Sequence, residues 1–240
     1  MKQFFCVLLA TFTLLVSQAQ TTVSDANAEI RKVGSFSAVS ISNAFDVIIT
    51  QGAEEAVAVS ASDKDDVQYI KTEVKDGVLR ISFDPKDKKF WPKNRKLRAY
   101  ISAKNLNAIS AGGASNIKIE GGLSAAQLKL NFSGASDLKG KLNVTGALDV
   151  RLSGASDIEI SGSATELSVD ASGASDLKAF DFVVSNCKKI EASGASSVRI
   201  SVNNEISEAR LSGASSLTYK GNPSIKDIRT SGASSVSRKS

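Results

Sequence analysis

A four-residue block, Ser-Gly-Ala-Ser, returns throughout the second half of this chain and limits how the chain can fold. Seven copies are present, the first with Gly112 in place of the leading serine. One glycine from each copy aligns the set: Gly113, Gly134, Gly154, Gly173, Gly194, Gly213 and Gly232. Neighbouring glycines are 19 to 21 residues apart. A period near 20 residues is typical of a solenoid, in which each repeat forms one turn of a stack.

The residues that flank the blocks predict strands. Apolar residues alternate with polar ones before a block, as at Leu148, Val150 and Leu152, and again after it, as at Ile158 and Ile160. This period of two is typical of strands with one buried face, and the spacing of leucine-rich repeats is absent. We therefore predict an all-β fold, a right-handed parallel β-helix with about 20 residues per rung.

The block itself is expected to form the corner of each rung. Glycine adopts positive φ at little steric cost, and we expect the alanine to point inward at a narrow bend and the serines to hydrogen-bond to neighbouring backbone. A degenerate copy lies upstream, where Asn43 stands in the glycine position. Because asparagine also tolerates positive φ, we predict that the solenoid begins near Phe36.

The N-terminal portion is predicted to be a less regular, strand-rich stack on the same core. Alternating apolar residues predict strands in 57–60, 69–74, 78–83 and 97–101. A turn is expected at 75–77, and one helical turn within 62–69, with Asp65 and Asp66 near its start. We expect a single domain over residues 30–240, with irregular rungs in 30–110 and regular rungs in 111–236.

The first 19 residues are typical of a secretory signal peptide. Lys2 is followed by an apolar run from Phe4 to Val16 and by the small residues Ser17 and Ala19. The run is shorter than a bilayer span, and no later segment is apolar enough to be a transmembrane helix. We therefore expect cleavage after Ala19, a linker at 20–29, and export to the periplasm, the cell surface or the extracellular space.

Composition excludes several function classes. The chain has no histidine, so serine–histidine and cysteine–histidine catalytic systems are impossible. Signal removal leaves one cysteine, Cys187, so an intramolecular disulfide is excluded. Its neighbours Lys188 and Lys189 could lower the pKa of the thiol, but we assign it no redox role. With a net charge of only +5 and 6% aromatic residues, we expect no nucleic-acid binding.

A row of acidic residues follows the repeated block. In stacked rungs Asp137, Asp157 and Asp176 would lie above one another at about 4.8 Å, which raises the alternatives of a cation site or an acidic groove for sugar chemistry. The competing interpretation is a solvated ladder, because cations such as Lys139 and Lys178 follow two residues later. We favour the ladder, assign no metal, cofactor or catalytic residue, and keep the three aspartates as candidate ligand contacts.

An insertion at residues 84–96 breaks the strand rhythm with two prolines and carries the single tryptophan. Its aromatic and cationic residues are a candidate platform for a glycan or a protein. Alternatively, the aromatics fold back onto the core while the lysines stay in water. The candidate contacts are Phe90, Trp91, Lys93 and Arg95.

These features together resemble a family of secreted bacterial domains described as "putative auto-transporter adhesin, head GIN domain". The resemblance covers about residues 30–236. It rests on Phe36, Val39 and Ile41, on the Phe45-Asp46-Val47 segment, on the turn and strand at 76–81, and on the serial Gly-Ala-Ser rungs. It implies a right-handed β-helix and offers no established catalytic residues.

We expect an exported, non-enzymatic binding or scaffold protein, adhesin-like, with an envelope protein or polysaccharide as its partner. The first alternative is a carbohydrate-active β-helix enzyme, a lyase or hydrolase, that uses the stacked aspartates. A second alternative is a self-assembling structural element, a homo-oligomer, because the end of a solenoid is an unpaired strand edge unless it is capped.

Overall fold

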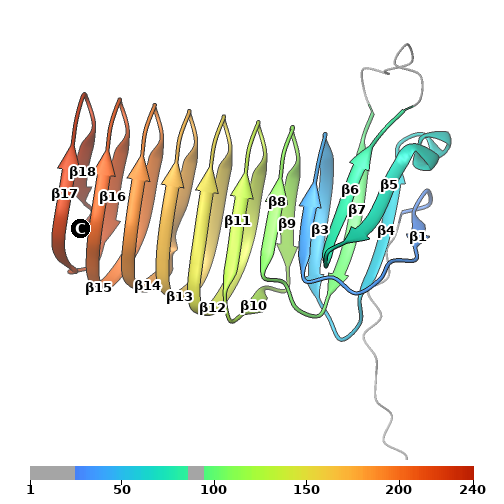
Figure 1. The fold of residues 1–240 in the computed structure, drawn as a ribbon, viewed down its shortest axis with the longest axis horizontal. Coiled ribbons are helices and arrows are strands. Elements are labelled where there is room, and N and C mark those ends of the chain that lie inside the picture. The colour runs from blue at the N-terminus through green and yellow to red at the C-terminus, as the bar shows by residue number, and fades with distance from the viewer. Residues whose placement is uncertain (1–24, 86–94) are drawn as a thin grey trace, which may run out of the picture.

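A computed structural model describes residues 25–85 and 95–240, which form a β-solenoid of about seven turns with about 20 residues per turn. Strands stack in parallel along the long axis of the molecule (Figure 1), as the repeat predicts. Within these residues, no helix is long and apolar enough to span a membrane.

The strands fall into an irregular and a regular part. The irregular part contains β1 (Glu29–Arg31), β2 (Ala38–Ile41), β3 (Phe45–Gln51), β4 (Ala56–Ala61), the 3-10 helix η1 (Lys64–Tyr69), β5 (Ile70–Lys75), β6 (Val78–Phe83) and β7 (Leu97–Ala103). The regular part contains β8 (Ala108–Ala111), β9 (Asn116–Glu120), β10 (Leu123–Ala125), β11 (Leu128–Phe132), β12 (Asp137–Leu152), β13 (Asp157–Ala171), β14 (Asp176–Ala192), β15 (Ser197–Leu211), β16 (Ser216–Lys220), β17 (Ser224–Thr230) and β18 (Ser235–Arg238).

Each regular turn has two sides. The leading face contains the segments that run into a Ser-Gly-Ala-Ser corner, namely β8, β11, the second halves of β12 to β15, and β17. The trailing face contains the segments that leave a corner, namely β9, the first halves of β12 to β15, β16 and β18. Strands β12 to β15 continue through the return bend from the trailing to the leading side, so one turn is one bent strand plus one corner.

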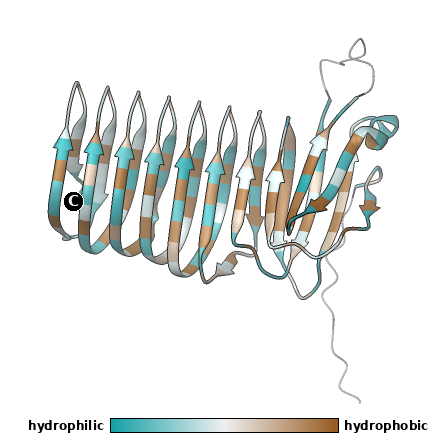
Figure 2. Cartoon of the chain, viewed as in Figure 1, coloured by the Kyte–Doolittle hydropathy of each residue, from teal (hydrophilic) through white to brown (hydrophobic). Residues whose placement is uncertain are grey.

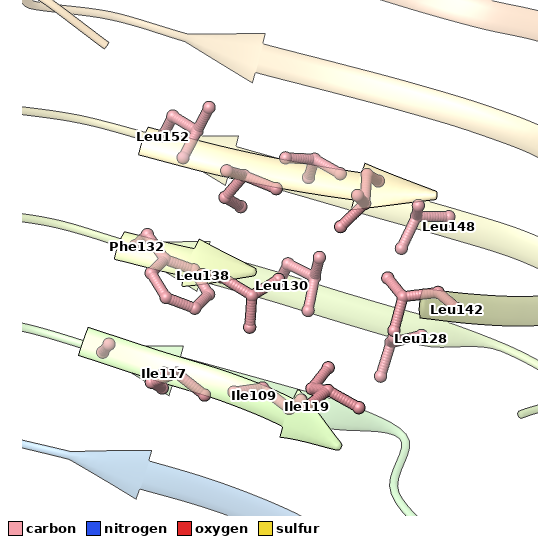
Figure 3. Close-up of a cluster of buried hydrophobic side chains, with 14 of the residues drawn as sticks. Ile109, Ile117, Ile119, Leu128, Leu130, Phe132, Leu138, Leu142, Leu148 and Leu152 are labelled. Carbon is pink, nitrogen blue, oxygen red and sulfur yellow. The ribbon is translucent and has the colours of Figure 1, made fainter. Parts of the chain in front are cut away.

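The hydrophobic core lies between the two faces. Leu148, Val150 and Leu152 point inward from the leading face, and Leu138 and Leu142 point inward from the trailing face, all with at most 2% of their surface exposed. Figure 3 shows side chains of this core on successive turns, among them Leu138, Leu142, Leu148 and Leu152. Hydrophobic and hydrophilic bands alternate along the strands (Figure 2), as strands with one buried face require.

The corners confirm the prediction for glycine. Gly154 has φ 74°, and a Cβ on it would lie 2.4 Å from the carbonyl oxygen of Gly134. The amide of Ala155 donates a hydrogen bond of 2.7 Å to that same oxygen. Two independent constraints, the positive φ and the close approach of neighbouring turns, therefore select glycine at this position.

Asn43 occupies the glycine position at the start of the stack and has φ 77°, which confirms that the degenerate copy is a corner. Its side chain lies toward β6, and its Oδ1 accepts a hydrogen bond of 2.9 Å from the amide of Phe83. The amide side chain thus pairs a backbone group at the end of β6, a role that glycine cannot fill.

The prediction that the alanine of the repeated block points inward is wrong. Ala155 is exposed, whereas the serine that follows it, Ser156, is completely buried. Its Oγ donates to the carbonyl of Ser153 at 3.0 Å, and it accepts from the amide of Ser136 at 3.4 Å. The bend leaves backbone groups buried without strand partners, so a small hydroxyl side chain is selected at the inward position.

The irregular part stacks in an order that differs from the order of the sequence. Strand β2 lies between β6 and β8, and β3 lies between β7 and β9, all in parallel. The solenoid turn made of β6 and β7 therefore lies outside the one made of β2 and β3, and the end of β6 and the start of β7 lie beside the corner that joins β2 to β3. Antiparallel strands, β4 beside β7 and β5 beside β6, end the stack on this side.

Local predictions for this part are confirmed. The β5–β6 turn at 75–77 has positive φ at Asp76 (53°) and Gly77 (72°), as a tight hairpin requires. The predicted helical turn is η1, with Asp65 and Asp66 in its first turn. Asp63 precedes it and its side chain accepts a hydrogen bond of 3.0 Å from the amide of Asp65.

The N-terminal segment is fastened to the outer surface by Asp25. Its Oδ2 accepts hydrogen bonds from Ser60 Oγ at 2.6 Å, Tyr100 Oη at 2.9 Å and Arg98 Nη1 at 3.1 Å. These donors, Ser60 above all, lower the pKa of the Asp25 carboxyl to about 2. The charged carboxylate therefore joins residue 25 to β4 and β7.

Candidate binding site on the trailing face

The three predicted aspartates lie in one row on the outside of the trailing face. Asp137 pairs in register with Asp157, and Asp157 pairs with Asp176. The row continues through Asn116 to Asp46, whose Oδ1 accepts a hydrogen bond of 3.2 Å from the amide side chain of Asn116. The positions of the three aspartates could be predicted from the repeat, because equivalent residues in stacked turns become neighbours.

Cations two residues later pair with this row. Lys178 Nζ donates to Asp157 Oδ2 at 2.8 Å and lies 3.7 Å from Asp176 Oδ2, which also pairs with Arg199 at 3.2 Å. The hydrogen bond to Asp157 raises the pKa of Lys178. In the row two residues after the aspartates, Lys139 pairs with Glu159 at 2.7 Å. Among the described residues there is no cluster of three or more metal-ligating side chains, and the geometry is that of an ion-paired ladder.

A shallow groove crosses this ladder. One part of about 450 Å³ is lined by both charged and apolar residues between Asp46 and Lys178. The second part, of about 720 Å³, extends the groove to the return bend and towards the C-terminus. Both parts share Lys118, Lys139, Glu159 and Lys178, so they form one continuous surface, which we call the trailing groove.

Sequence reasoning missed the aromatic residue in this groove, Phe180. The pairing of β14 with β15 jumps from Ala179 to Val183, so residues 180–182 have no partners in that ladder. Phe182 is fully buried, whereas Phe180 is partly exposed and lines the groove. The one signal in the sequence was the 21-residue interval between Gly173 and Gly194, which is longer than the two intervals that follow it.

Only one of the predicted contacts in the 84–96 insertion, Arg95, lies within the residues that the structure describes. Phe90, Trp91 and Lys93 lie outside the residues that the structure describes. Arg95 is described, and its guanidinium binds both carboxylate oxygens of Asp66, at 2.6 and 3.1 Å. It also lies 4.4 Å from the centre of the Phe83 ring and its side chain is only 8% exposed. Arg95 therefore anchors the base of the insertion to η1 and β6.

The leading face carries a second groove, of about 480 Å³, beside the corners. It is lined by small polar residues such as Ser133 and Ser153, and by Asn131, Arg151 and Asp170. The hydroxyls of Ser133 and Ser153 already donate to backbone carbonyls of the preceding turn, at 3.4 and 3.5 Å. These hydroxyls therefore serve the stacking of the turns.

Cys187 is completely buried, and burial raises the pKa of its thiol to about 12. The expectation that flanking cations could lower this pKa is wrong. Lys188 and Lys189 are both exposed, so they lie in water while the thiol lies in the core. Desolvation of the thiolate then outweighs the cations.

Several solved structures share this fold, and at these levels of identity the likeness shows the fold alone. A "putative adhesin" from Bacteroides fragilis is 22% identical, with a TM-score of 0.78, 88% of this chain covered and 96% of its own. A "putative adhesin" from Parabacteroides merdae is 19% identical, with a TM-score of 0.64 and coverages of 89% and 95%. A "putative lipid binding protein" from Parabacteroides distasonis is 19% identical, with a TM-score of 0.61 and coverages of 90% and 98%.

A search of curated protein sequences found no match. The family described as "Putative auto-transporter adhesin, head GIN domain" matches residues 35–223, which include the irregular turns and most of the Gly-Ala-Ser corners. The match begins just before Phe36, where the degenerate corner predicts the start of the solenoid. This chain therefore belongs to the family of "putative auto-transporter adhesin, head GIN domain" proteins.

Proposed function

We propose that this chain is an exported, non-enzymatic binding or scaffold protein, adhesin-like, that acts at the cell envelope or the cell surface. The observation that carries the proposal is the trailing groove, a long open surface whose polar side chains stand on hydrogen-bonded strands. Such a surface fits an extended ligand that is held without chemical change. The adhesin description of the family supports the same function.

A binding screen tests this function. The protein is immobilised and exposed to a panel of envelope glycans, both neutral and acidic, and to outer-membrane and periplasmic protein fractions. We expect saturable binding of at least one ligand, with no change in its mass or chain length. Absence of saturable binding across the panel would contradict the proposal.

The enzyme alternative is tested with the same glycans. A lyase or hydrolase needs carboxyl groups that are open to the substrate. Asp157 and Asp176 instead accept hydrogen bonds from Lys178 and Arg199. We therefore expect no shortened products when the parent is incubated with each polysaccharide. Cleavage by the parent that disappears in Asp157→Asn would favour the enzyme.

Export is supported by the signal-like pattern of residues 1–19 and by the family description. We expect the mature chain to begin at Gln20, because Ser17 and Ala19 fit the small-residue positions before a cleavage site. Mass spectrometry of the N-terminus, together with protease treatment of intact cells, checks processing and location. A full-length chain in the cytoplasmic fraction would contradict export.

Self-assembly is a second candidate, favoured by the C-terminal end of the stack. Within the described residues, β17 pairs only with β15 and β18 pairs only with β16, so each has one unpaired edge. Ile225 on β17 is 39% exposed beside this edge. Pairing with a second copy would cover both features. Light scattering over a range of concentrations tests this candidate, and a monomer at every concentration would exclude it.

A further inference from the structure

The cationic half of the trailing groove is built around Phe180. Residues 180–182 bulge out of the β14–β15 ladder, and the bulge is held by Ser201 Oγ, which donates a hydrogen bond of 2.6 Å to the carbonyl of Phe180. The Phe180 ring lies among the groove-lining residues, while Phe182 fills the core. The aromatic position is thus fixed by the backbone.

Two lysines from later turns lie over this ring. Lys220 Nζ is 4.9 Å and Lys239 Nζ is 4.7 Å from the ring centre. The amide of Lys239 donates a hydrogen bond of 2.8 Å to the carbonyl of Tyr219, which fixes the backbone at this point. Because aromatic faces attract cations, Phe180 holds two ammonium groups of long, flexible side chains at one edge of the groove.

The positive charge left over in this half of the groove comes from lysines that form no ion pair among the described residues. The cations of this half come from five turns and outnumber its two carboxylates, Glu159 and Asp181; they are Lys118, Lys139, Lys141, Lys178, Arg199 and Lys239. Four of these cations are ion-paired, Lys118 with Glu120, Lys139 with Glu159, Lys178 with Asp157 and Arg199 with Asp176. In the part of the chain that the structure describes, Lys141 and Lys239 have no carboxylate within ion-pair distance. Their charges remain for a ligand.

We propose that this half of the trailing groove binds an acidic polysaccharide whose sugar units carry carboxylates. The inference rests on the proposed binding function and names its ligand class. Carboxylates of the glycan would meet the lysines, and its hydroxyls would donate hydrogen bonds to Glu159 and Asp181. Successive turns are spaced by about 4.8 Å, which is similar to the length of one sugar unit, so repeated charges meet repeated side chains.

The same charge pattern disfavours a nucleic acid. Double-stranded DNA carries one phosphate charge per about 1.7 Å of its axis and needs a surface of nearly uniform positive sign. Here the cations alternate with carboxylates, and the ladder of Asp137, Asp157 and Asp176 runs beside them. A polyuronate, with a single carboxylate on each sugar unit and free hydroxyls between the charges, complements this mixed surface better.

The test measures binding of polygalacturonate and alginate by calorimetry, with dextran as the uncharged control. The variant carries Lys141→Gln and Lys239→Gln, which remove two of the groove charges and leave the ion pairs of the ladder intact. Lys129→Gln is the matched control, because Lys129 is exposed on β11 of the leading face. Circular dichroism establishes that each variant is folded.

We expect the acidic glycans to bind the parent and dextran not to bind. The double variant should raise the Kd about tenfold, which is about 1.4 kcal/mol in total or ~0.7 kcal/mol for each of the two exposed charge contacts. Lys129→Gln should leave the Kd unchanged. Binding should also weaken steeply at about 1 M salt, where charges on the surface are screened.

Other outcomes overturn the inference and separate it from the proposed function. Equal weakening by Lys129→Gln would mean nonspecific charge attraction. Tighter binding of anionic lipid vesicles or of DNA would assign the groove to phosphate ligands. Binding of dextran or of an envelope protein without binding of acidic glycans would reject the ligand class and leave the binding function intact. Binding of nothing in the panel would reject both.

Discussion

Replacing Gly154 with alanine tests the corner geometry most directly, because the change adds one methyl group and nothing else. The residue has φ 74°, which costs an alanine about 1–2 kcal/mol. The new Cβ would also lie 2.4 Å from the Gly134 carbonyl oxygen. Relief of that overlap moves a backbone atom that accepts the 2.7 Å hydrogen bond of Ala155. Overpacking of this kind usually costs a further ~1–3 kcal/mol.

Two control variants separate these causes. Gly121 has φ 75°, but a Cβ added there would meet nothing within 4 Å. Gly121→Ala should therefore lower the free energy of unfolding only by the cost of the left-handed backbone conformation, about 1–2 kcal/mol. Gly34 has neither a positive φ nor a close neighbour, so Gly34→Ala should be neutral or stabilising by up to about 1 kcal/mol. The three sites therefore form a graded series.

Urea denaturation followed by circular dichroism gives the free energy of unfolding of each variant. We expect Gly154→Ala to lower the free energy of unfolding by about 2–5 kcal/mol. Gly154→Ala should be the most destabilised variant, Gly121→Ala the next, and Gly34→Ala the least. If Gly154→Ala loses no more than Gly121→Ala, the close stacking of neighbouring corners is wrong, and positive φ alone explains the repeated glycine.

Three further predictions use other parts of the same structure. Ser156→Ala should lower the free energy of unfolding in urea by about 1–3 kcal/mol, because the partly buried carbonyl of Ser153 loses the hydroxyl that donates to it. Ala155→Ser at the exposed neighbour should change stability by less than about 0.5 kcal/mol. The pKa of Asp25 is lowered to about 2, so its contribution to stability is present above pH 3.8 and is lost as the pH falls towards about 2. Asp25→Asn should therefore remove this part of the acid dependence of the melting temperature. An unchanged dependence would contradict the assignment. Cys187, with its pKa raised to about 12, should not react with a thiol reagent at about pH 8 until the protein is unfolded, and rapid reaction of the native protein would refute its burial.

Much of the fold could be predicted, because residues that lie one repeat apart in the sequence of a solenoid are neighbours in space. Residues at equivalent places in successive repeats pair in register, so the row of Asp137, Asp157 and Asp176 and the cations beside it follow from counting. Asn43 could be placed as a corner for the same reason, since its chemistry matches that of the repeated glycine. Local rules were enough for the hairpin at 75–77 and for η1.

The candidate site was less predictable. Phe180 enters the trailing groove because β14 holds residues beyond what its neighbour can pair, and Phe180 and Phe182 cannot be told apart by period alone. Lys220 and Lys239 reach that ring from positions 40 or more residues later in the chain. Contacts between a bulge and later turns depend on where the bulge projects, which the sequence does not encode as a pattern.

The sequence by itself determined the all-β solenoid, the place of its corners and the residues that share a row, because repetition and alternation fix register and facing. Only the tertiary structure decided which small residue points inward at the corner, where Ser156 rather than Ala155 is buried to satisfy backbone carbonyls. It also decided that the β6–β7 turn stacks outside β2–β3, since strand partners are chosen by packing across the whole stack. Burial likewise outweighed sequence neighbours at Cys187, because desolvation acts through three-dimensional surroundings and not through adjacency in the chain.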